Sequence, residues 1–499
     1  MHGAIAPLFF SERGRIVYYS LRKDCYIRAI GDFGYIKSSG LFNDLVFDKS
    51  GQVFLSALSR QPRSLEEMAT EIAEKFLDIK AIDIMEDVED FFDLLVEDGY
   101  AVKGETCENT IRNNIGFNYN EIKQISMEED YTPKNIRSDN DSQMALDEYF
   151  KKNPYLSNFQ IELTSKCNER CIHCYIPHEY KLFDIDEELY YSVLHQLRDM
   201  GTLGLTLSGG EPMVHPKFKE FLKTAKEMDF YVHILTNLTL LDDETIHLMR
   251  EGNACGVQVS LYSMIPEHHD QITQVNGSFE KTKAGIIKLI ENNIPVQINC
   301  PVMKANQNDV CDVIAWGHSK KIRTNVDYAI MAGFDHHTSN LAHRLSPEEC
   351  RKVITDIIEY DEDYKDLIIR YQIDSADMAR ESKACDPFCG IAINTACMVA
   401  DGSVYPCPGW QGFKCGNLKE QPLEEIWYFS PKMKYLRGLK RSDIKECDGC
   451  ENRLFCSPCL VRFANESPTN DPLEVARHFC DVARVNKEVV TSYTEKFGH

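Results

Sequence analysis

Residues 159–177 read FQIELTSKCNERCIHCYIP, and this stretch decides the fold of the chain. Its first six residues are mostly apolar or β-branched, which predicts a buried strand. Three cysteines follow at once, spaced by three and then two residues: Cys167, Cys171 and Cys174. Three thiolates can hold three irons of a [4Fe–4S] cube and leave the fourth iron open to another ligand. We therefore expect a metal-binding loop directly after a strand.

The strand at 159–164 begins a regular alternation of strands and helices. Further strands are predicted at 203–209, 231–237, 256–262, 295–302 and 325–331. Amphipathic helices between them are predicted at 186–201, 216–229, 242–252, 278–293 and 312–322. This order is the βα repeat of a parallel sheet. We predict an α/β fold, a partial (βα)6 barrel resembling a TIM barrel, with its functional residues at the carboxyl ends of the strands.

A second motif follows the second predicted strand. The turn at 208–212 reads SGGEP, and its glycines let the main chain approach a ligand closely. A Cx3Cx2C loop after the first strand and a GGEP turn after the second resemble the radical S-adenosylmethionine (SAM) superfamily. The resemblance implies that the open iron binds SAM, and that the turn packs against the methionine part of SAM through Gly209, Gly210, Glu211 and Pro212. A structural zinc site completed by His173 is the alternative.

Other polar residues end the later strands. Asn237 ends the third, Ser260 the fourth and Asn299 the fifth. By the same resemblance, Ser260 and Asn299 would face the SAM carboxylate or ribose, and Asn237 is a further cofactor-binding candidate. Each of these side chains could instead cap a helix or satisfy a turn.

Composition limits the partners and the compartment. The 499 residues include 78 acidic and 55 basic side chains, giving a net charge of −23. This charge, without a basic stripe, argues against nucleic acid as a partner. No apolar run approaches the ~20 residues that span a membrane, and the start lacks the features of a signal peptide. We expect a cytoplasmic protein with no membrane association.

The 19 cysteines are unevenly distributed. In a reducing compartment, clustered cysteines indicate metal binding rather than disulfides. Thirteen are clustered, at 167–174 and 385–480. The other six are expected as small buried hydrophobes: Cys25, Cys107, Cys255, Cys300, Cys311 and Cys350.

The ten cysteines between 385 and 480 lie in a segment rich in Cys, Gly and Pro, without clear periodicity from about 376 to 485. This composition predicts a small domain held by metal rather than by a large core. Their pattern is Cys389-x12-Gly402-x4-Cys407, then Cys447-x2-Cys450-x5-Cys456-x2-Cys459, then Cys480. It resembles the SPASM domain, whose cysteines carry two auxiliary [4Fe–4S] clusters.

The SPASM resemblance assigns ligands to both auxiliary clusters. The first would be held by Cys385, Cys389, Cys407 and Cys459, and the second by Cys447, Cys450, Cys456 and Cys480. Because the last pair is spaced by two residues where the usual form has three, the role of Cys459 stays open. Cys397 or Cys415 could replace Cys385, and a paired CxxC arrangement also suits zinc.

The N-terminal residues predict a small winged-helix-like α+β domain. A strand pair around a glycine turn is expected at 25–38, and a break at Ser50–Gly51. Ser64 and Glu67 have the spacing of a capping box before a helix, and a second helix at 83–98 ends at Gly99 before a short strand at 100–102. The order resembles the PqqD-type precursor-peptide recognition element, in which a leader peptide adds as an extra strand to the sheet edge, against the last helix. A structural or oligomerisation winged helix is the alternative.

The chain therefore divides into four expected parts. They are a PqqD-like peptide recognition domain at 1–104, a linker at 105–150, a radical SAM core at 151–375 and a SPASM domain at 376–499. Together the resemblances imply SAM, one SAM-binding [4Fe–4S] cluster and two auxiliary clusters as cofactors. They also imply a precursor peptide, bound through its leader, and an electron donor such as flavodoxin or ferredoxin as partners.

The reaction implied by these resemblances is radical modification of a ribosomally made peptide. Thioether formation between a cysteine sulfur and a carbon is the leading expectation, with carbon–carbon or carbon–oxygen cross-linking and epimerisation as alternatives. Oxidation of a protein substrate, as in sulfatase maturation, is a different class, and a non-enzymatic metal-bound scaffold is a third. The discriminating residues belong to the substrate.

Overall fold

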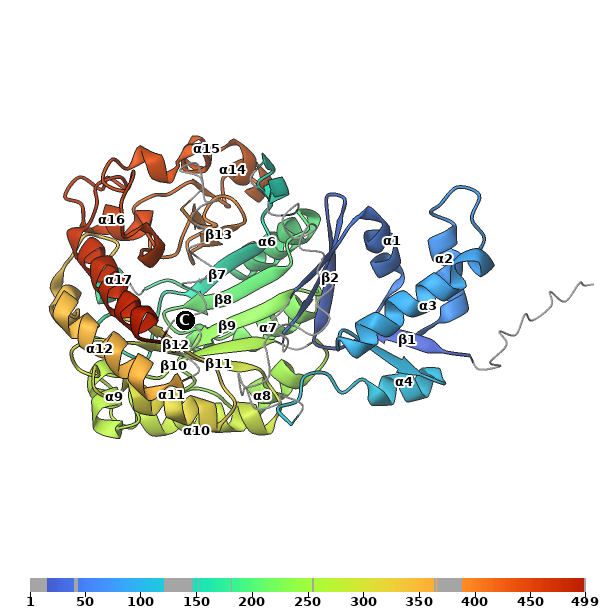
Figure 1. Ribbon diagram of the computed structural model, residues 1–499, viewed down its shortest axis with the longest axis horizontal. Coiled ribbons are helices and arrows are strands. Elements are labelled where there is room, and N and C mark those ends of the chain that lie inside the picture. Colours follow the sequence, from blue (N-terminus) through green and yellow to red (C-terminus); the bar gives the residue numbers. More distant parts are fainter. Residues whose placement is uncertain are drawn as a thin grey trace, which may run out of the picture. The chain divides into compact units, whose positions relative to one another are not determined.

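The computed structural model describes residues 16–39, 44–120, 146, 148–150, 152–180, 182–253, 255–362, 365 and 388–497. Cys385 and most of the second half of the expected linker lie outside these residues. The chain divides into two compact units, the first formed mainly by residues up to 118 and the second by most of the remaining chain (Figure 1).

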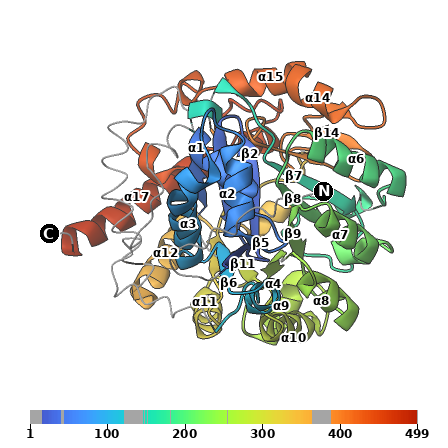
Figure 2. The same ribbon diagram turned by 90° about the vertical axis from the view of Figure 1, so that its right-hand side faces the viewer.

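The first unit combines two small antiparallel sheets with helices (Figures 1 and 2). In one sheet β1 (Tyr18–Leu21) lies between β5 (Arg63–Ser64) and β6 (Ala101–Gly104). The other has the order β2 (Cys25–Ile30), β3 (Phe33–Ser38) and β4 (Leu45–Phe47). The helices are α1 (Lys49–Ala57), α2 (Leu65–Ala73), α3 (Ala81–Glu97) and α4 (Cys107–Asn113). The last of these lies in the segment expected as a linker and packs against β1 and β6.

Local signals in the sequence place most of these elements. The hairpin of β2 and β3 forms as predicted, with Ile30 opposite Phe33. The capping box is confirmed, because Ser64 Oγ accepts from the Glu67 amide at 3.3 Å while the Ser64 amide donates to the Glu67 carboxylate at 2.9 Å. Gly99, with φ of 79°, allows the turn that ends α3.

The break expected at Ser50–Gly51 is wrong. Both residues lie in the first turn of α1, whose amino end is capped by Asp48 accepting from the Gly51 amide at 2.9 Å. A Cβ on Gly51 would lie 2.5 Å from Cβ of Phe47. Glycine is therefore used here for close packing of α1 against β4 and not for a turn.

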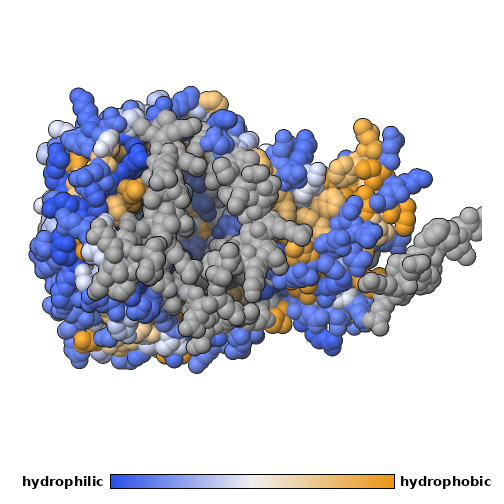
Figure 3. All heavy atoms as spheres, viewed as in Figure 1, coloured by the Kyte–Doolittle hydropathy of each residue, from blue (hydrophilic) through white to orange (hydrophobic). Residues whose placement is uncertain are grey.

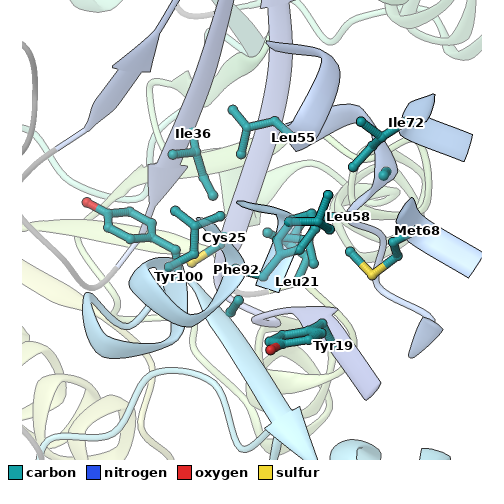
Figure 4. Close-up of a cluster of buried hydrophobic side chains, with 14 of the residues drawn as sticks. Tyr19, Leu21, Cys25, Ile36, Leu55, Leu58, Met68, Ile72, Phe92 and Tyr100 are labelled. Carbon is teal, nitrogen blue, oxygen red and sulfur yellow. The ribbon is translucent and has the colours of Figure 1, made fainter. Parts of the chain in front are cut away.

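Hydrophobic side chains also lie at the surface of this unit. Figure 3 shows them over the connection between α2 and α3, where Leu77, Ile79 and Ile82 are exposed. The core of the unit is shown in Figure 4, with Phe92 of α3 among residues of β1, β2, α1 and α2. The ring of Phe92 lies 5.6 Å from that of Tyr19, whose hydroxyl donates to Asp93 at 2.6 Å.

The second unit contains a nine-stranded sheet, in which six consecutive strands, starting from one edge, are the predicted parallel strands. In spatial order these are β12 (Thr324–Asp327), β11 (Val296–Pro301), β10 (Gly256–Ser260), β9 (Tyr231–Thr236), β8 (Gly204–Gly209) and β7 (Asn158–Thr164). All six predicted strands are confirmed, in an uninterrupted sequential order. The order is the one expected of a partial barrel, in which each strand is placed beside its predecessor.

Helices follow the strands as predicted and cover one face of the sheet (Figures 1 and 2). They are α6 (Glu187–Asp199), α7 (Phe218–Glu227), α8 (Asp243–Arg250), α10 (Ser278–Glu291) and α11 (Val310–Ser319). Two helices were not predicted, α9 (Pro266–Thr273) and α12 (Pro347–Tyr360). The α9 sequence, PEHHDQIT, contains a single aliphatic residue and therefore shows no clear helical period.

The parallel strands separate apolar from polar side chains. On β7, Phe159, Ile161 and Leu163 are buried apolar residues. The alternate positions on the same strand carry Gln160 and Glu162, and Gln160 Nε2 donates to Ser208 Oγ of β8 at 2.7 Å. The alternation continues on β10 and β11, where Gln258, Ser260, Gln297 and Asn299 occupy the second face. That face is polar, as a surface that binds a polar cofactor requires.

The sheet continues beyond the predicted barrel. β13 (Thr395–Met398) pairs parallel to β7, and β14 (Ser403–Tyr405) and β15 (Gly416–Asn417) extend the sheet antiparallel. Helices follow: α14 (Leu423–Phe429), α15 (Pro431–Gly438), α16 (Leu460–Glu466) and α17 (Arg477–Phe497). These elements give the segment more regular structure than its weak periodicity indicated. Trp410 and Trp427 are fully buried in it.

The isolated cysteines divide by burial. Cys25, Cys255, Cys300 and Cys350 are buried as predicted, whereas Cys107 is exposed and Cys311 is half-buried. Among the described residues, none of the helices combines the length and the apolar character needed to cross a bilayer.

Truncation of Phe92 to alanine should lower the free energy of unfolding of the first unit by about 3–5 kcal/mol, because it leaves a cavity in a fully buried core. Hydrogen exchange by mass spectrometry on the full chain should show faster exchange across residues 16–118. Exchange in the parallel strands should be unchanged. The exposed Leu77, changed to alanine, is the matched control and should cost less than about 0.5 kcal/mol. Equal effects of the two substitutions would contradict the assignment of this core.

Candidate metal and cofactor centre

The loop that follows β7 is held on two sides by main-chain hydrogen bonds. On one side, the Gly210 amide donates to the Thr164 carbonyl at 2.8 Å and the Glu211 amide to the Lys166 carbonyl at 2.9 Å. On the other side, the amides of Arg170 and Ile172 donate to carbonyls at the end of α9, each at 3.0 Å. The turn after β8 and the unpredicted α9 therefore position the loop that carries the three cysteines.

The three thiols of this loop lie near one another. Burial raises the pKa of Cys171, and the neighbouring thiols of Cys174 and Cys167 raise it further. The Cys174 amide donates to the Cys171 carbonyl at 3.1 Å, which folds the end of the motif into a tight turn. Cys167, Cys171 and Cys174 thus lie on one loop, although among the described residues no group of three or more Cys, His, Asp or Glu side chains is placed to hold a metal ion.

The two glycines of the turn are required by the approach of the chain. A Cβ on Gly209 would lie 2.1 Å from the Thr164 carbonyl oxygen, and φ at Gly209 is 149°. A Cβ on Gly210 would lie 2.3 Å from the Lys166 carbonyl oxygen. Both obstacles are backbone atoms, which cannot rotate away as a side chain can. Only glycine permits the turn to lie directly against the cysteine loop.

The side chains of Glu211 and Asn237 form hydrogen bonds with other groups of the chain. The Glu211 carboxylate accepts from Thr236 Oγ1 at 2.8 Å and from the amides of Asn237 and Met213 at 2.7 and 3.1 Å. Burial raises the pKa of Glu211 to about 7, and these hydrogen bonds oppose the rise. Asn237 Nδ2 donates to Asn168 Oδ1 in the cysteine loop at 2.9 Å. These side chains join the ends of β8 and β9 to the cysteine loop, and Pro212 begins a short 3-10 helix there.

Ser260 and Asn299 lie opposite each other in the register of β10 and β11. Both side chains are half-buried on the polar face of the sheet. The structure therefore places both predicted residues at the same carboxyl edge of the sheet as the cysteine loop.

The cysteines beyond residue 388 fall into two groups. Burial, together with the nearby thiols of Cys459 and Cys389, raises the pKa of Cys407 to about 12. In the second group the pKa of Cys456 is raised to about 11, by burial and by the thiols of Cys480, Cys447 and Cys450. These are the two sets that the SPASM resemblance implies, with Cys385 outside the described residues.

The two spare candidates make hydrogen bonds to carbonyl groups of the protein. The buried Cys397 lies on β13 and its thiol donates to the Tyr405 carbonyl at 3.5 Å. The Cys415 thiol donates to the Phe413 carbonyl at 3.5 Å. The thiols near Cys397 are those of Cys407 and Cys415. The thiols that raise the pKa of Cys407 are those of Cys459 and Cys389.

Three further residues of the centre were missed from the sequence. Glu169, inside the cysteine loop, is buried, and its Oε1 has no hydrogen-bond partner among the described residues. Glu162 of β7 is also buried, and its Oε1 accepts from Gln411 Nε2 at 3.4 Å. Burial and the nearby Asp401 raise the pKa of Glu162 to about 8, so this carboxyl holds a proton at pH 7. An acidic residue inside an apolar strand was the available signal for Glu162.

The third missed residue, Tyr262, is buried and its hydroxyl lies 3.8 Å from Cys171 Sγ. In the sequence, Tyr262 was the last residue of a predicted strand, and no motif indicated a functional role for it.

These features fit the cofactors expected from the sequence. Three thiols on one loop suit a cluster with one open iron. In the same loop, the buried Glu169 Oε1 has no hydrogen-bond partner among the described residues. The glycine turn offers main-chain groups close by, and the adjacent strand ends offer hydroxyl and amide groups. This donor set matches a bound amino acid or nucleoside better than an apolar ligand.

Comparison with known families agrees with this centre. Residues 161–317 match the radical SAM superfamily, and residues 389–451 match the iron–sulfur cluster-binding SPASM domain. Among curated relatives, the AdoMet-dependent heme synthase of Methanosarcina barkeri is 25% identical over 327 residues, which are 60% of this chain and 90% of the relative. The PqqA peptide cyclase of Rhizobium meliloti is 24% identical over 326 residues, 62% of this chain and 85% of the relative.

A solved structure shares the fold. SuiB of Streptococcus suis, in its complex with the precursor peptide SuiA, aligns with a TM-score of 0.58 at 15% identity. The alignment covers 92% of this chain and 99% of SuiB. Residues 161–317 are thus a radical SAM domain and residues 389–451 belong to a SPASM domain, so the cofactors of this protein are SAM, the [4Fe–4S] cluster that binds it and auxiliary iron–sulfur clusters.

Proposed function

We propose that this protein is a radical SAM enzyme that modifies a ribosomally synthesised precursor peptide, forming thioether links between cysteine sulfur and carbon. The observation that carries the proposal is the three-thiol loop after β7, held by the main chain of Gly210 and Glu211. When bound, the cluster and SAM supply the one-electron cleavage that yields methionine and a 5′-deoxyadenosyl radical, which abstracts hydrogen from the substrate.

The residues of the chain bind and orient these cofactors. In the proposal, Cys167, Cys171 and Cys174 hold the SAM-binding cluster. The turn at 209–212 receives the methionine part of SAM through its main chain, because the Glu211 carboxylate is occupied within the protein. Ser260, Asn299 and Asn237 would complete the SAM site from the neighbouring strand ends.

The two other thiol groups are proposed as the auxiliary cluster sites. Cys389, Cys407 and Cys459 hold the first, with Cys385 as the fourth ligand, and the second is held by Cys447, Cys450, Cys456 and Cys480. The proximity of Cys459 to Cys407 and Cys389 supports its role despite the unusual x2 spacing. Cys397 and Cys415 are then spare thiols.

The peptide substrate is supported by the PqqA peptide cyclase relative, whose name states a peptide substrate. The first unit is proposed as the leader-binding element, PqqD-like and winged-helix-like, within residues 1–104. In the sheet of β2, β3 and β4, the edge strand β4 lies next to α3, because the rings of Phe47 and Phe91 are 5.2 Å apart. A leader strand added along β4 would contact α3, which carries seven acidic residues and no basic one. Basic residues in the leader would complement this helix.

The remaining features of the proposal follow from the sequence alone. The proposal includes an electron donor such as flavodoxin or ferredoxin and a cytoplasmic location. It also includes a linker at residues 105–150, a radical SAM core at 151–375 and a SPASM domain at 376–499. The heme synthase relative makes a small-molecule substrate the competing class. A protein substrate is the alternative within the peptide class.

The SAM-binding turn gives a prediction. Gly210→Ala should weaken SAM binding at least about tenfold, equivalent to about 1.4 kcal/mol, because the new Cβ collides with the Lys166 carbonyl and displaces the turn. Equilibrium binding of SAM to the reconstituted protein under anaerobic conditions measures this. Gly438→Ala, where a Cβ meets nothing within 4 Å, is the control and should bind SAM normally. Normal binding by Gly210→Ala would refute the placement of SAM at this turn.

The thiol groups give a second prediction. Cys459→Ala should remove one auxiliary cluster and lower the iron content by about four atoms per chain. Cys397→Ala, a change at a fully buried position of the same domain, should leave the iron content unchanged. Iron and sulfide analysis of the anaerobically purified variants decides between the two. Loss of iron in Cys397→Ala but not in Cys459→Ala would exchange their roles.

Co-expression with a candidate precursor peptide tests the reaction. Each thioether should lower the peptide mass by about 2 Da, since two hydrogens are lost, and should protect the cysteine involved from alkylation. Cys174→Ala should abolish the change. Mass loss with a freely alkylated cysteine would indicate a carbon–carbon or carbon–oxygen link, and deuterium uptake without mass loss would indicate epimerisation. Unmodified peptides that also fail to bind the full chain, with SAM cleavage intact, would favour another substrate class.

A further inference from the structure

The phenol of Tyr262 lies directly against the thiol of Cys171. Tyr262 follows the end of β10 by two residues and is 3% exposed. Its hydroxyl donates to Cys171 Sγ at 3.8 Å, within the range of a hydrogen bond to the larger sulfur atom. The phenol therefore joins the segment that follows β10 to a candidate cluster ligand.

The backbone of Tyr262 is fixed from several directions. Its amide donates to His269 Nδ1 at 3.3 Å, and burial lowers the pKa of His269 to about 4, so the imidazole is neutral and can accept. Its carbonyl accepts from Asn306 Nδ2 at 2.7 Å and from the Cys300 thiol at 3.8 Å. The hydroxyl is thus aimed at Cys171 before any cofactor binds.

The ring of Tyr262 has little freedom either. It contacts the rings of His173 and His269, with centroids 5.2 and 5.3 Å away. Because His173 lies between Cys171 and Cys174 in the loop, the ring packs against the same loop that its hydroxyl contacts. A side chain held in this way keeps its hydrogen bond without a large entropic cost.

A donor at this sulfur has a defined electrostatic effect. Reduction adds negative charge to an iron–sulfur cluster, and hydrogen bonds to its sulfur atoms stabilise that charge and raise the reduction potential. The effect is larger in a buried site, where the local dielectric constant is low. The Tyr262 hydroxyl, buried and beside Cys171, meets both conditions.

We propose that Tyr262 is a positioning residue that sets the reduction potential of the SAM-binding cluster by donating a hydrogen bond to Cys171 Sγ. This inference rests on the proposed assignment of Cys171 as a cluster ligand.

The substitution Tyr262→Phe tests the proposal by removing only the hydroxyl. Iron content should be retained, and the midpoint potential of the cluster should become more negative. An anaerobic redox titration followed by electron paramagnetic resonance measures it, using the part of the signal that changes when SAM is added. Tyr190→Phe is the matched control. Tyr190 lies on α6 and is fully buried, and its hydroxyl donates to the Phe221 carbonyl at 2.9 Å. The control should leave the potential unchanged.

A second variant separates tuning from packing. Replacement of Tyr262 by 3,5-difluorotyrosine keeps the shape of the ring and makes the phenol a stronger donor, so the potential should become less negative. Opposite shifts in the two variants are not expected of a residue that only fills space. Equal potentials in wild type and both variants would overturn the proposal, as would loss of iron from both.

The assignment of Cys171 has its own check. Cys171→Ala that retained the SAM-responsive signal would refute the ligand set and, with it, the proposed function. If Cys171→Ala loses that signal as expected, but the Tyr262 variants keep the midpoint potential of the wild type, only the role of Tyr262 is refuted.

Discussion

The centre of this protein depends on the main-chain contact between the turn after β8 and the loop after β7. The amides of Gly210 and Glu211 donate to the carbonyls of Thr164 and Lys166, and this contact is possible only because residues 209 and 210 lack a Cβ. The contact brings the end of one strand to the loop of its neighbour. It thereby places main-chain groups beside the three thiols, where a ligand of the open iron would lie.

Buried polar side chains extend that contact to the rest of the sheet. Glu211 accepts hydrogen bonds from Thr236 and Asn237, which join β8 to β9, and a third from the nearby Met213 amide. Asn237 continues from β9 to Asn168 in the cysteine loop. A buried carboxylate without these partners would cost several kcal/mol. The polar residues of the turn therefore act first as a scaffold, and the chemistry of the cofactors is placed on that scaffold.

The sequence predicted the elements whose signal is local. The six strands of the barrel were found because their apolar runs are separated by amphipathic helices, and the capping box of Ser64 and Glu67 marked the start of α2. The errors occurred where tertiary packing overrides local preference. Gly51 lies inside α1, where it allows close packing on Phe47, and α9 contains too few apolar residues to show a period. β13 is recognised only by its pairing with β7.

The sequence by itself determined the chemical identity of the centre, because ligand type and spacing are properties of the chain. Cx3Cx2C, GGEP and the later cysteines indicated SAM and iron–sulfur clusters before any fold was known. Only the tertiary structure decided which residues are neighbours across long sequence distances. Cys459 lies near Cys407 and Cys389, and Tyr262 donates to Cys171, 91 positions earlier. Such contacts depend on how strands and helices pack, and no local pattern in the sequence encodes them.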